Sequence, residues 1–555
     1  MVNTVGTNRE LPTLKWISPW NLAVGILAFI LISPILAVFV AAGADSDGLW
    51  WHLLETVLPR YVTNTLVLMM GVAIVTLVFG VTTAWIVARY EFVFRGPLEW
   101  MLLLPAAVPA YLIAYTYTDF LEYAGPVQGA LRQAFGWQNA RDYWFPEIRS
   151  MEGAVFVMGA VLYPYVYMMM RIAILLTPAT YFEIAMLAGR SKFWRVALPL
   201  SRPAISAGLA LVLMETISDF GTVEYFAIET LTLGIFNVWL GMNNLAAAAQ
   251  IACVAFLFVI ILLVFELKAR AHRRFHETGR RSTVLRRRVL TGIPGFSCLL
   301  ICSIPIILGF AIPVGVLLGF VIEGYSLQFE TEMLRAAGNS FSISAIVAFL
   351  VVVSACLMLS VTHFRGGKFL YALSSMASTG YAFPGTLLAI GVVTAAGAID
   401  SSYSILVERL FGIPSQALLS GTIGLVIFAC VVRFQAIGYG AINSGLSRLP
   451  TNLMNASRVL GHSFGNSLIS VVLPLIKLSM ITGGLLVFVD VMKELPMTLL
   501  LRPFNFETLA TFVYQYAKDE LLEEAALPAL AIILTGILPV FIMNATIRRA
   551  AGENQ

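Results

Sequence analysis

Long apolar runs constrain this chain more than any other feature of its sequence. A helix needs about 20 mostly apolar residues to cross roughly 30 Å of hydrocarbon, and runs of that length recur from residue 19 to residue 547. Of the 555 residues, 59% are hydrophobic and only 12% are charged, which leaves no stretch for a sizeable soluble domain. The sequence therefore predicts an all-α polytopic membrane protein that works in or beside the bilayer.

The apolar runs fall into two sets of six. The first run is too long for the core of a signal peptide and lacks a small-residue cleavage site, so we expect a retained span. The twelve predicted spans are 19–42, 61–89, 96–118, 154–177, 203–222, 246–267, 293–322, 335–362, 369–398, 419–441, 468–491 and 526–547. The predicted organisation is an N-terminal segment at 1–18, a first six-helix half at 19–267, a basic linker at 268–292, a second half at 293–547 and a tail at 548–555.

Charged residues predict the orientation of these spans. Basic residues concentrate in 1–18, in 190–202 and in the linker, where residues 268–288 hold nine Lys or Arg against one acid. Acidic residues populate 119–150, 323–334 and 519–524. By the positive-inside rule both termini are expected in the cytoplasm. The linker could bind nucleic acid, but as a short connector between spans it is better explained as a topogenic segment that meets lipid headgroups, so we expect lipids and no nucleic acid as partners.

The two sets of spans repeat each other at a nearly constant offset. Matched positions lie 275 residues apart: Asn64-Thr65 and Asn339-Ser340, Pro109 and Pro384, and Pro199 and Pro474. Because an even number of spans separates equivalent points, the two halves are predicted to be parallel repeats related by an axis along the membrane normal. A pathway on that axis would take corresponding helices from each half.

A polar loop is repeated between the fourth and fifth span of each half, on the side that the basic residues mark. One copy runs from Glu183 to Pro199, EIAMLAGRSKFWRVALP, and the other from Asn455 to Pro474, NASRVLGHSFGNSLISVVLP. Each joins a small-residue helical turn to a glycine, a polar linker and Val-x-Leu-Pro, and glycine suits a chain reversal because it tolerates positive φ. Mere connectors are free to diverge, so the repeat predicts two short helices that dock a partner in the cytoplasm.

The repeated loop resembles the EAA loop of permeases of ATP-binding-cassette (ABC) importers. In that family Glu-Ala-Ala, three residues, Gly, nine residues and Ile-x-Leu-Pro form the coupling helix that sits in a groove of the ATPase. The first copy keeps the acid but has only six residues between Gly189 and Val196, whereas the second keeps nine after Gly461 and has Asn455 in place of the acid. The coupling residues implied by the resemblance are Glu183, Ala185, Gly189, Asn455, Ala456 and Gly461.

The resemblance covers roughly residues 60–550. The fusion of two halves and the stretch 489–530, with 211–239 as its first-half counterpart, are most similar to fused ferric-iron permeases. This implies the fold of type I ABC importer transmembrane domains in a bacterial inner membrane, alternating access, two copies of a cytoplasmic ATPase and a periplasmic substrate-binding protein. Related fused permeases carry thiamine, and other relatives carry polyamines or aminophosphonates. The chain has no Gly-x-x-x-x-Gly-Lys-Ser/Thr motif, so we expect no cofactor here and place ATP and Mg²⁺ in the partner.

Four acids lie in or near the fifth span of each half. Glu215 and Asp219 are four residues apart and share a helical face, and the 275-residue offset carries them to Asp490 and Glu494. Carboxylates inside membrane helices are costly, so their default interpretation is functional. If the fifth span enters near Pro203, the first two acids lie about 18 and 24 Å deep. We therefore predict a substrate pathway lined by all four.

Carboxylate oxygens suit a hard cation such as ferric iron, so the four acids are predicted to make transient contacts with the metal. Alternatively, they pair with bases, cap broken helix ends or hold gates shut, since Lys493 neighbours Glu494 and Gly221 and Pro496 interrupt the segments.

Two rival functions remain open from the sequence. An ion-coupled secondary transporter could use the same four acids as a proton or sodium relay, although it would not need docking loops. An intramembrane enzyme lacks a credible constellation, because the five histidines are scattered over loops and span ends: His52, His272, His276, His363 and His462.

Overall fold

The computed structural model describes residues 18–271, 287–324, 331–412, 417–450 and 452–550. Nearly all of the predicted N-terminal segment, most of the basic linker and the end of the tail lie outside these residues. Eleven helices in the described part are long and apolar enough to cross a membrane, or up to twelve if a bent pair counts as one span. The prediction of an all-α polytopic protein with about twelve spans is confirmed.

The first half contributes the following elements: α1 (Pro19–Ala42), α2 (Leu49–Thr56), α3 (Leu58–Arg89), α4 (Arg95–Met101), η1 (Leu104–Ala107), α5 (Ala110–Leu121), α6 (Pro126–Phe135), α7 (Met151–Leu175), α8 (Ala179–Leu187), η2 (Phe193–Ala197), α9 (Leu198–Ser218), α10 (Gly221–Tyr225), α11 (Leu231–Phe236), η3 (Asn237–Gly241) and α12 (Leu245–Ala271). A short strand β1 (Tyr90–Glu91) pairs in parallel with β2 (Arg288–Val289).

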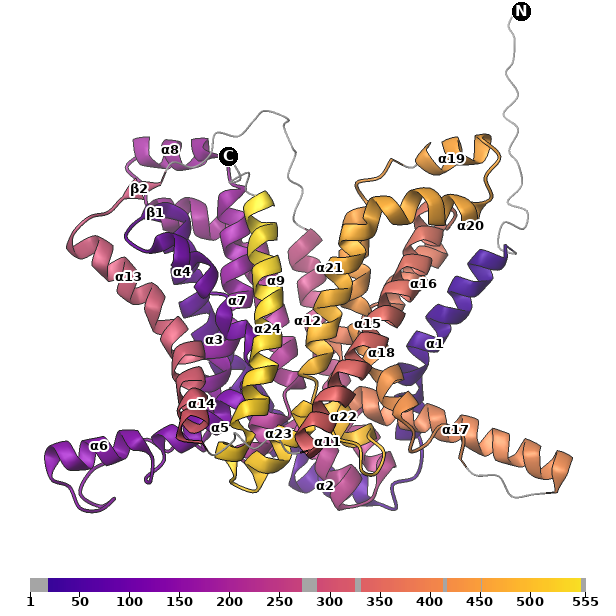
Figure 1. The fold of residues 1–555 in the computed structure, drawn as a ribbon, viewed down its shortest axis with the longest axis horizontal. Coiled ribbons are helices and arrows are strands. Elements are labelled where there is room, and N and C mark those ends of the chain that lie inside the picture. Colours follow the sequence, from indigo (N-terminus) through magenta and orange to yellow (C-terminus); the bar gives the residue numbers. More distant parts are fainter. Residues whose placement is uncertain (1–17, 272–286, 325–330, 413–416, 451, 551–555) are drawn as a thin grey trace, which may run out of the picture.

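The second half repeats this order: α13 (Ile293–Ile306), η4 (Ile307–Ala311), α14 (Ile312–Glu323), α15 (Thr331–Phe364), α16 (Lys368–Ala377), η5 (Gly380–Ala382), α17 (Gly385–Phe411), α18 (Ile423–Leu446), α19 (Asn452–Val459), α20 (Phe464–Ser467), η6 (Leu468–Val472), α21 (Leu473–Met492), α22 (Pro496–Leu501), α23 (Leu509–Lys518) and α24 (Leu522–Ala550). The helices α8 and α19 lie at one end of the bundle, and α2, α6 and α23 lie at the other (Figure 1).

The repeated Asn-Thr/Ser pair makes equivalent hydrogen bonds in both halves. The side-chain amide of Asn64 donates to the carbonyl of Glu229 at 3.0 Å, and that of Asn339 donates to Glu507 at 2.9 Å. The next hydroxyl, on Thr65 or Ser340, accepts the first amide of α11 or α23, respectively. These bonds satisfy backbone groups of helices that begin inside the bundle, where water cannot do so. The sequence repeat therefore reflects a structural repeat.

The predicted spans at 96–118 and 369–398 are not continuous helices. Each breaks before a repeated proline, Pro109 or Pro384, and a new helix, α5 or α17, starts directly after it. Proline lacks an N–H and disfavours helical geometry in the residue before it, so the break falls there. In the first half the segments on either side of the break, Arg95–Ala107 and Ala110–Phe135, meet at 93°.

The packing does not follow the division of the sequence into halves. Helix α1 packs on α16 and α17 of the second half. The segment from α13 to α14, which includes η4, packs on α3, α5, α7 and η1 of the first half. The last helix of each half also reaches the other half. Helix α12 packs on α17 as well as on α1, α9 and α11 of its own half, and α24 packs on η1, α4 and α5 as well as on α14, α21 and α23 of its own half. We call the body containing α3–α9, α13–α14 and α24 the first lobe, and the body containing α15–α21, α1 and α12 the second lobe.

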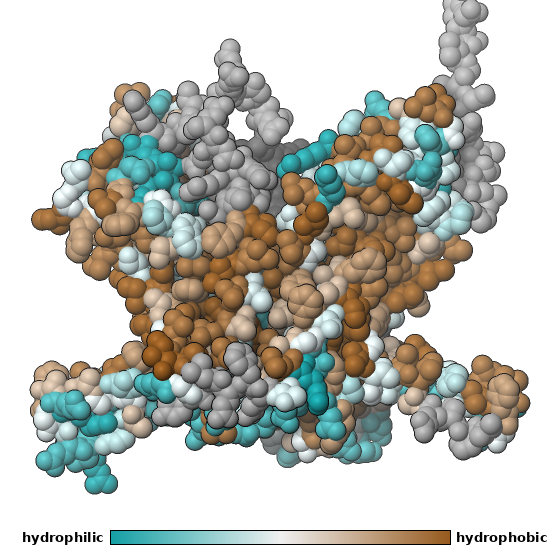
Figure 2. All heavy atoms as spheres, viewed as in Figure 1, coloured by the Kyte–Doolittle hydropathy of each residue, from teal (hydrophilic) through white to brown (hydrophobic). Residues whose placement is uncertain are grey.

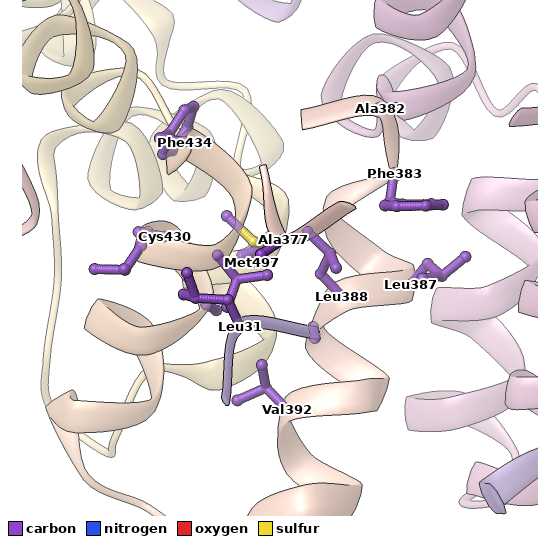
Figure 3. Packing of buried hydrophobic residues seen from close by; sticks show 14 of the residues in the cluster. Leu31, Ala377, Ala382, Phe383, Leu387, Leu388, Val392, Cys430, Phe434 and Met497 are labelled. Atoms are coloured by element: carbon purple, nitrogen blue, oxygen red, sulfur yellow. The ribbon is translucent and has the colours of Figure 1, made fainter. Parts of the chain in front are cut away.

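The core of the second lobe shows how closely a crossing helix fits. A side chain at Gly391 of α17 would clash with the carbonyl oxygen of Pro34 in α1, only 2.0 Å from the position of a Cβ atom. Small residues let membrane helices approach in this way. Figure 3 shows Leu31 of α1 among buried side chains of the second half, including Leu387, Leu388, Val392, Cys430 and Met497.

A belt of apolar side chains surrounds the middle of the molecule (Figure 2). Many large apolar residues on it are exposed, among them Ile74 of α3 and Phe349 of α15. Such a belt would be unfavourable in water and suits the hydrocarbon core of a bilayer. The two ends of the bundle carry the polar side chains.

Candidate functional site

A central pocket of about 130 Å³ lies where the two lobes meet. The helices α9 and α21 both end at this level, and a short helix, α10 or α22, follows each after a gap of two or three residues. All four predicted acids line the pocket: Glu215, Asp219, Asp490 and Glu494. The structure therefore brings together in one cavity the carboxylates that the sequence repeat paired.

Two of the acids hold the broken helices together. Asp219 accepts hydrogen bonds from the amides of Thr222 and Val223, which begin α10. Glu494 accepts from the amides of Met497 and Thr498, which begin α22, at 3.1 Å each. A carboxylate at the N-terminus of a helix satisfies amides that have no partner in the helix and is favoured by its dipole. The capping alternative therefore describes these two acids.

The other two acids lie one helical turn earlier and make different contacts. The phenol of Tyr381, in η5, donates a hydrogen bond to Glu215 across the boundary between the halves. Asp490 forms an ion pair with Lys493 at 2.9 Å, within its own helix end. The carboxylate of Glu215, from the first half, is thus in direct contact with the hydroxyl of Tyr381, from the second half.

The two capping acids differ in their charge partners. Arg433 of α18 contacts Glu494 at 3.5 Å. Both residues are buried, with only 8% and 6% of their surface exposed, respectively. The 275-residue offset places Met158 at the equivalent position in α7, also on the pocket wall, so no arginine comes from that position to Asp219. One half of the pocket therefore neutralises its capping acid and the other does not.

The pocket is rich in oxygen ligands but is not a preassembled metal centre. Its charged lining consists of four acids and two bases, Arg433 and Lys493, and Tyr111, Tyr165 and Tyr381 add phenols. Across the described residues, no three His, Cys, Asp or Glu side chains are grouped so that they could hold a metal ion together. The predicted ferric-iron contacts of the four acids would need a different arrangement from this one.

Sequence reasoning missed Arg433 and Tyr381 as members of the site. Arg433 lies in the middle of the run 419–441, where an ionisable residue is itself a functional signal. Tyr381 belongs to no sequence pattern that would distinguish it from the other tyrosines of the chain. Two further acids, Glu224 of α10 and Glu507 in the loop before α23, do not line the pocket and form ion pairs with Lys518 and Arg502, respectively.

The repeated polar loops form the helices α8 and α19 at the opposite end from α6 and α23 (Figure 1). The glycine that follows each helix has positive φ, +64° at Gly189 and +89° at Gly461. The residue after the glycine donates its amide to a carbonyl five residues back, Ala185 or Ser457. This is the hydrogen bond that closes a helix with a left-handed residue, and it explains the repeated glycine.

The two loop helices bury and expose equivalent positions. Counting back from each glycine, the seventh and fourth residues are buried: Phe182 and Ala185 in α8, Met454 and Ser457 in α19. The second residue back is apolar and almost fully exposed, 85% for Leu187 and 87% for Val459. Glu183 of α8 and Asn455 and Ala456 of α19 are also exposed. An apolar side chain held out in this way is typical of a protein interface.

Aromatic contacts attach the two loops to different helices. Phe193, after the first loop, contacts Trp85 of α3 with ring centroids 5.4 Å apart. Phe464, after the second, contacts Trp20 of α1 at 5.3 Å and lies under the guanidinium of Arg365. The second loop is therefore attached to a helix that crosses from the first half.

Comparison with known proteins shows the same two-part organisation. The family described as "Binding-protein-dependent transport system inner membrane component" matches residues 76–277 and again 363–551. The chain is 24% identical to the Fe(3+)-transport system permease protein FbpB 2 of Haemophilus influenzae over 88% of its length and 90% of that protein. It is 22% identical to the Putative ferric transport system permease protein FbpB 1 of the same organism, over 84% and 75%.

Permeases named for sulfate also match, each against about half of the chain. The Sulfate transport system permease protein CysW of Escherichia coli is 27% identical over 48% of this chain and 92% of its own length. Two matches to the family over most of the chain, together with a helical fold that repeats once, establish the class of protein. This chain belongs to the family of binding-protein-dependent transport system inner membrane components, the permeases of ABC importers.

Proposed function

We propose that this chain is the permease subunit of an ATP-driven importer of ferric iron and that iron passes through the central pocket between α9–α10 and α21–α22. The observation that carries the proposal is the set of four carboxylates at repeated positions around one cavity between the lobes. Family membership favours an ATP-driven importer over an ion-coupled carrier. Two relatives that match most of the chain are named for ferric transport.

The charge distribution of the pocket supports a cation. Lys493 and Arg433 form ion pairs with Asp490 and Glu494, whereas the hydrogen bonds to Glu215 and Asp219 come from a phenol and from amides and a hydroxyl, respectively. Negative charge is therefore concentrated on the first-half side, where a hard cation would be attracted. Lys493 and Asp490 lie three residues apart at the end of α21, so their ion pair moves as part of the second lobe. The two bases thus offset two of the four carboxylates and leave the pocket with an excess of acidic groups.

The coupling loops support an ATPase partner at one end of the bundle. Leu187 and Val459 project from equivalent places in α8 and α19, and each could enter a groove of a copy of the same ATPase, which gives two copies per permease. Closure of the ATPase pair on ATP would move the loops together and open the opposite end by alternating access. Glu183, Ala185, Gly189, Asn455, Ala456 and Gly461 belong to these two docking surfaces.

The same arrangement gives an orientation in the bacterial inner membrane. If α8 and α19 are on the cytoplasmic side, the start of α1 and the end of α24 are cytoplasmic too, because both lie toward the end of the bundle that carries α8 and α19 (Figure 1). The end with α2, α6 and α23 then faces the periplasm, where a substrate-binding protein would deliver its ligand.

A second candidate substrate is an oxyanion such as sulfate. The observation in its favour is that Arg433 and Lys493 line the pocket, and guanidinium and ammonium groups bind oxyanions. Four acids against two bases argue the other way. Thiamine, polyamines and aminophosphonates are further possibilities from the resemblance, and the first two carry the positive charge that the pocket would attract.

The decisive experiment measures uptake of ⁵⁵Fe(III), supplied on the binding protein, into proteoliposomes that contain the permease and its ATPase. Glu215→Gln combined with Asp219→Asn should lower uptake at least about tenfold, equivalent to about 1.4 kcal/mol of lost stabilisation. Glu224→Gln is the matched control, since Glu224 lies in α10 but not on the pocket wall. Unchanged uptake in the double variant, with the assembly intact, would remove both acids from the pathway.

Competitors identify the substrate class in the same assay. Excess sulfate, thiamine or spermidine should leave iron uptake unchanged. Uptake of labelled sulfate in place of iron would establish the second candidate, and uptake that continues without ATP would contradict the ATP-driven mechanism.

A further inference from the structure

Two helical arms extend sideways from the bundle at the end opposite the loop helices (Figure 1). The first arm is α6, and the second arm is the outer part of α17, residues 399–411. The 275-residue offset carries Pro126–Phe135 onto 401–410, so the arms are equivalent parts of the repeat. No activity described above uses them.

The second arm presents one continuous apolar face. At 100° per residue, six apolar side chains fall within about 140° of the helix surface. They are Ile399, Tyr403, Leu406, Val407, Leu410 and Phe411. All but Val407 are more than a third exposed, from 37% at Tyr403 to 70% at Phe411. Ser401, Ser402, Glu408 and Arg409 occupy the other side, together with one apolar exception, Ile405. The arm is thus an amphipathic helix whose apolar side is largely uncovered.

The first arm has the same character, and further aromatic residues follow it in the sequence. Val127, Leu131 and Phe135 follow one another at four-residue spacing. Phe135 stacks on Trp137 at 4.8 Å, and Trp137 stacks on Tyr143 at 4.7 Å. Stacked Trp and Tyr rings of this kind are enriched where hydrocarbon meets water.

Both arms are fastened to the segment that returns to the bundle. In the first arm the hydroxyl of Tyr143 donates to Gln128 at 2.6 Å, and Gln128 donates to the carbonyl of Leu121. In the second, Asp400 accepts three backbone amides from Leu418, Leu419 and Ser420. These bonds hold each arm at its root, so its sideways direction is built into the fold.

We propose that the two arms lie in the plane of the lipid–water interface, with their apolar faces in the acyl chains of one leaflet. The arms extend beyond the bundle next to the edge of the apolar belt, and in Figure 2 the first arm is hydrophilic along the side away from that belt. A water-soluble partner approaching this end would meet the hydrophilic side first. A helix with one apolar and one polar face lying parallel to a bilayer surface is stable in that position.

The arms would connect the lipid interface to the central pocket. α5 and α17 start directly after Pro109 and Pro384. Pro109, Ala110 and Tyr111 line the pocket wall, and Gly385 of α17 lies against Arg433 and Pro496, which also line it. An arm held at the interface fixes the outer end of a helix whose inner end touches the transport site. When the lobes move, the two arms would therefore stay at a constant depth in the leaflet. Only the assignment of the leaflet, the outer one, rests on the proposed function.

Site-directed spin labelling of the full chain in lipid nanodiscs tests this placement. In a variant with its five native cysteines replaced, labels at Leu406 and Leu410 of the apolar face are compared with labels at Ser401 and Glu408 of the polar face. Phe135 and Gln133 form the matched pair in the first arm, and Phe349 on the belt is the lipid-exposed standard. All these positions are exposed or on the surface, so the labels do not disturb the core.

The expected result is a several-fold higher ratio of oxygen to nickel-chelate accessibility at Leu406, Leu410 and Phe135 than at their polar partners, approaching that at Phe349. Equal nickel accessibility on both faces would overturn the proposal, because the arms would then project into water. Protection of the apolar face only after a periplasmic binding protein is added would also overturn it and would identify a protein as the occupant. The measurement does not depend on any transported substrate, so its failure is separable from failure of the proposed function.

Discussion

The two halves of the pocket use the same backbone device with different charge partners. In each half a carboxylate, Asp219 or Glu494, closes the gap after a broken span by accepting the first amides of the next short helix. Only the second half adds an arginine, Arg433, where the first has Met158. Capping is therefore the repeated function of this position, and charge neutralisation is not.

The asymmetry assigns different roles to equivalent residues. A buried, paired Glu494 is expected to matter most for stability, because a buried charge that loses its partner is strongly unfavourable. Asp219, with methionine at the position equivalent to that arginine, is held by hydrogen bonds from two amides and a hydroxyl. The halves are thus alike in architecture and divided in chemistry, and three comparisons between equivalent positions can break or sharpen this view.

The largest effect is expected at the ion pair. Glu494→Gln keeps an acceptor for the amides of α22 but leaves Arg433 buried without a negative partner, at a cost of about 3 to 5 kcal/mol. Asp219→Asn keeps the cap of α10 and strands no base, so its effect on stability should be much smaller. Thermal unfolding of the detergent-solubilised permease, followed by size-exclusion chromatography, measures both.

A second substitution provides the control for this pair. Arg433→Met copies the residue of the first half, and added to Glu494→Gln it should restore most of the lost stability. If Asp219→Asn destabilises as much as Glu494→Gln, or if the double variant is no more stable than Glu494→Gln alone, the distinction between the halves is wrong.

An intermediate effect is expected at the glycines of the coupling loops. The φ of Gly189, +64°, lies in the left-handed region that Asn also adopts, whereas the +89° of Gly461 lies outside it. Gly461→Asn should therefore cost about 1 to 2 kcal/mol in the loop, and Gly189→Asn should cost less, because Asn also occurs at this position after helices. The number of substrate molecules transported per ATP hydrolysed should fall for Gly461→Asn and stay near the unmodified value for Gly189→Asn.

Gly461→Val extends this test, since a β-branched side chain is least tolerated at positive φ. Full coupling in Gly461→Val would show that the turn does not set the docking geometry. Equal losses at both glycines would remove the difference in conformation as the cause.

The smallest effect is expected at the residue four places before each glycine. Ser457 of α19 shares a hydrogen bond of 2.8 Å with the hydroxyl of Ser467, and Ala185 occupies the equivalent place in α8. Ser457→Ala removes one bond, about 1 kcal/mol or less, because Ser467 keeps the carbonyl of Ser463 as an acceptor. Limited proteolysis of the loop at 452–467 should be slightly faster. A loss of transport comparable to that of Gly461→Val would mean that this bond, rather than the turn, positions the second loop.

The spans and the repeat could be predicted because both rest on strong local signals. Length and hydropathy identify helices that cross a membrane, and the offset between Asn64 and Asn339 marks positions that prove to make the same hydrogen bond. The paired acids were found for a similar reason, since a carboxylate in an apolar run is rare and therefore informative. Their meeting in one pocket follows once the halves are parallel.

Other features of the structure also have signals in the sequence. Pro109 and Pro384 stand at the breaks in their spans, and proline interrupts a helix for a steric reason. Arg433 is an ionisable residue in an apolar run, as the acids are. The first arm lies in the acidic segment 119–150, where Val127, Leu131 and Phe135 have helical spacing.

The exchange of first and last helices between the lobes could not be predicted in this way. In a membrane the apolar face that contacts protein is as hydrophobic as the face that contacts lipid, so hydropathy does not say which helix meets which. The close approach of Gly391 to Pro34 depends on shape alone. Partner choice is set by such small residues and becomes visible only in three dimensions.

The exchange has a consequence for the order in which the protein is made. A ribosome inserts the helices from the N-terminus onward, yet the first lobe needs α13, α14 and α24, the last of which ends at Ala550. The first lobe therefore cannot finish folding until almost the whole chain has been synthesised, and until then α3, α5 and α7 keep faces without their final partners. Biogenesis of this permease is complete only when its last helix enters the membrane, so a ribosome that stalls before α24 would leave the first lobe unfinished.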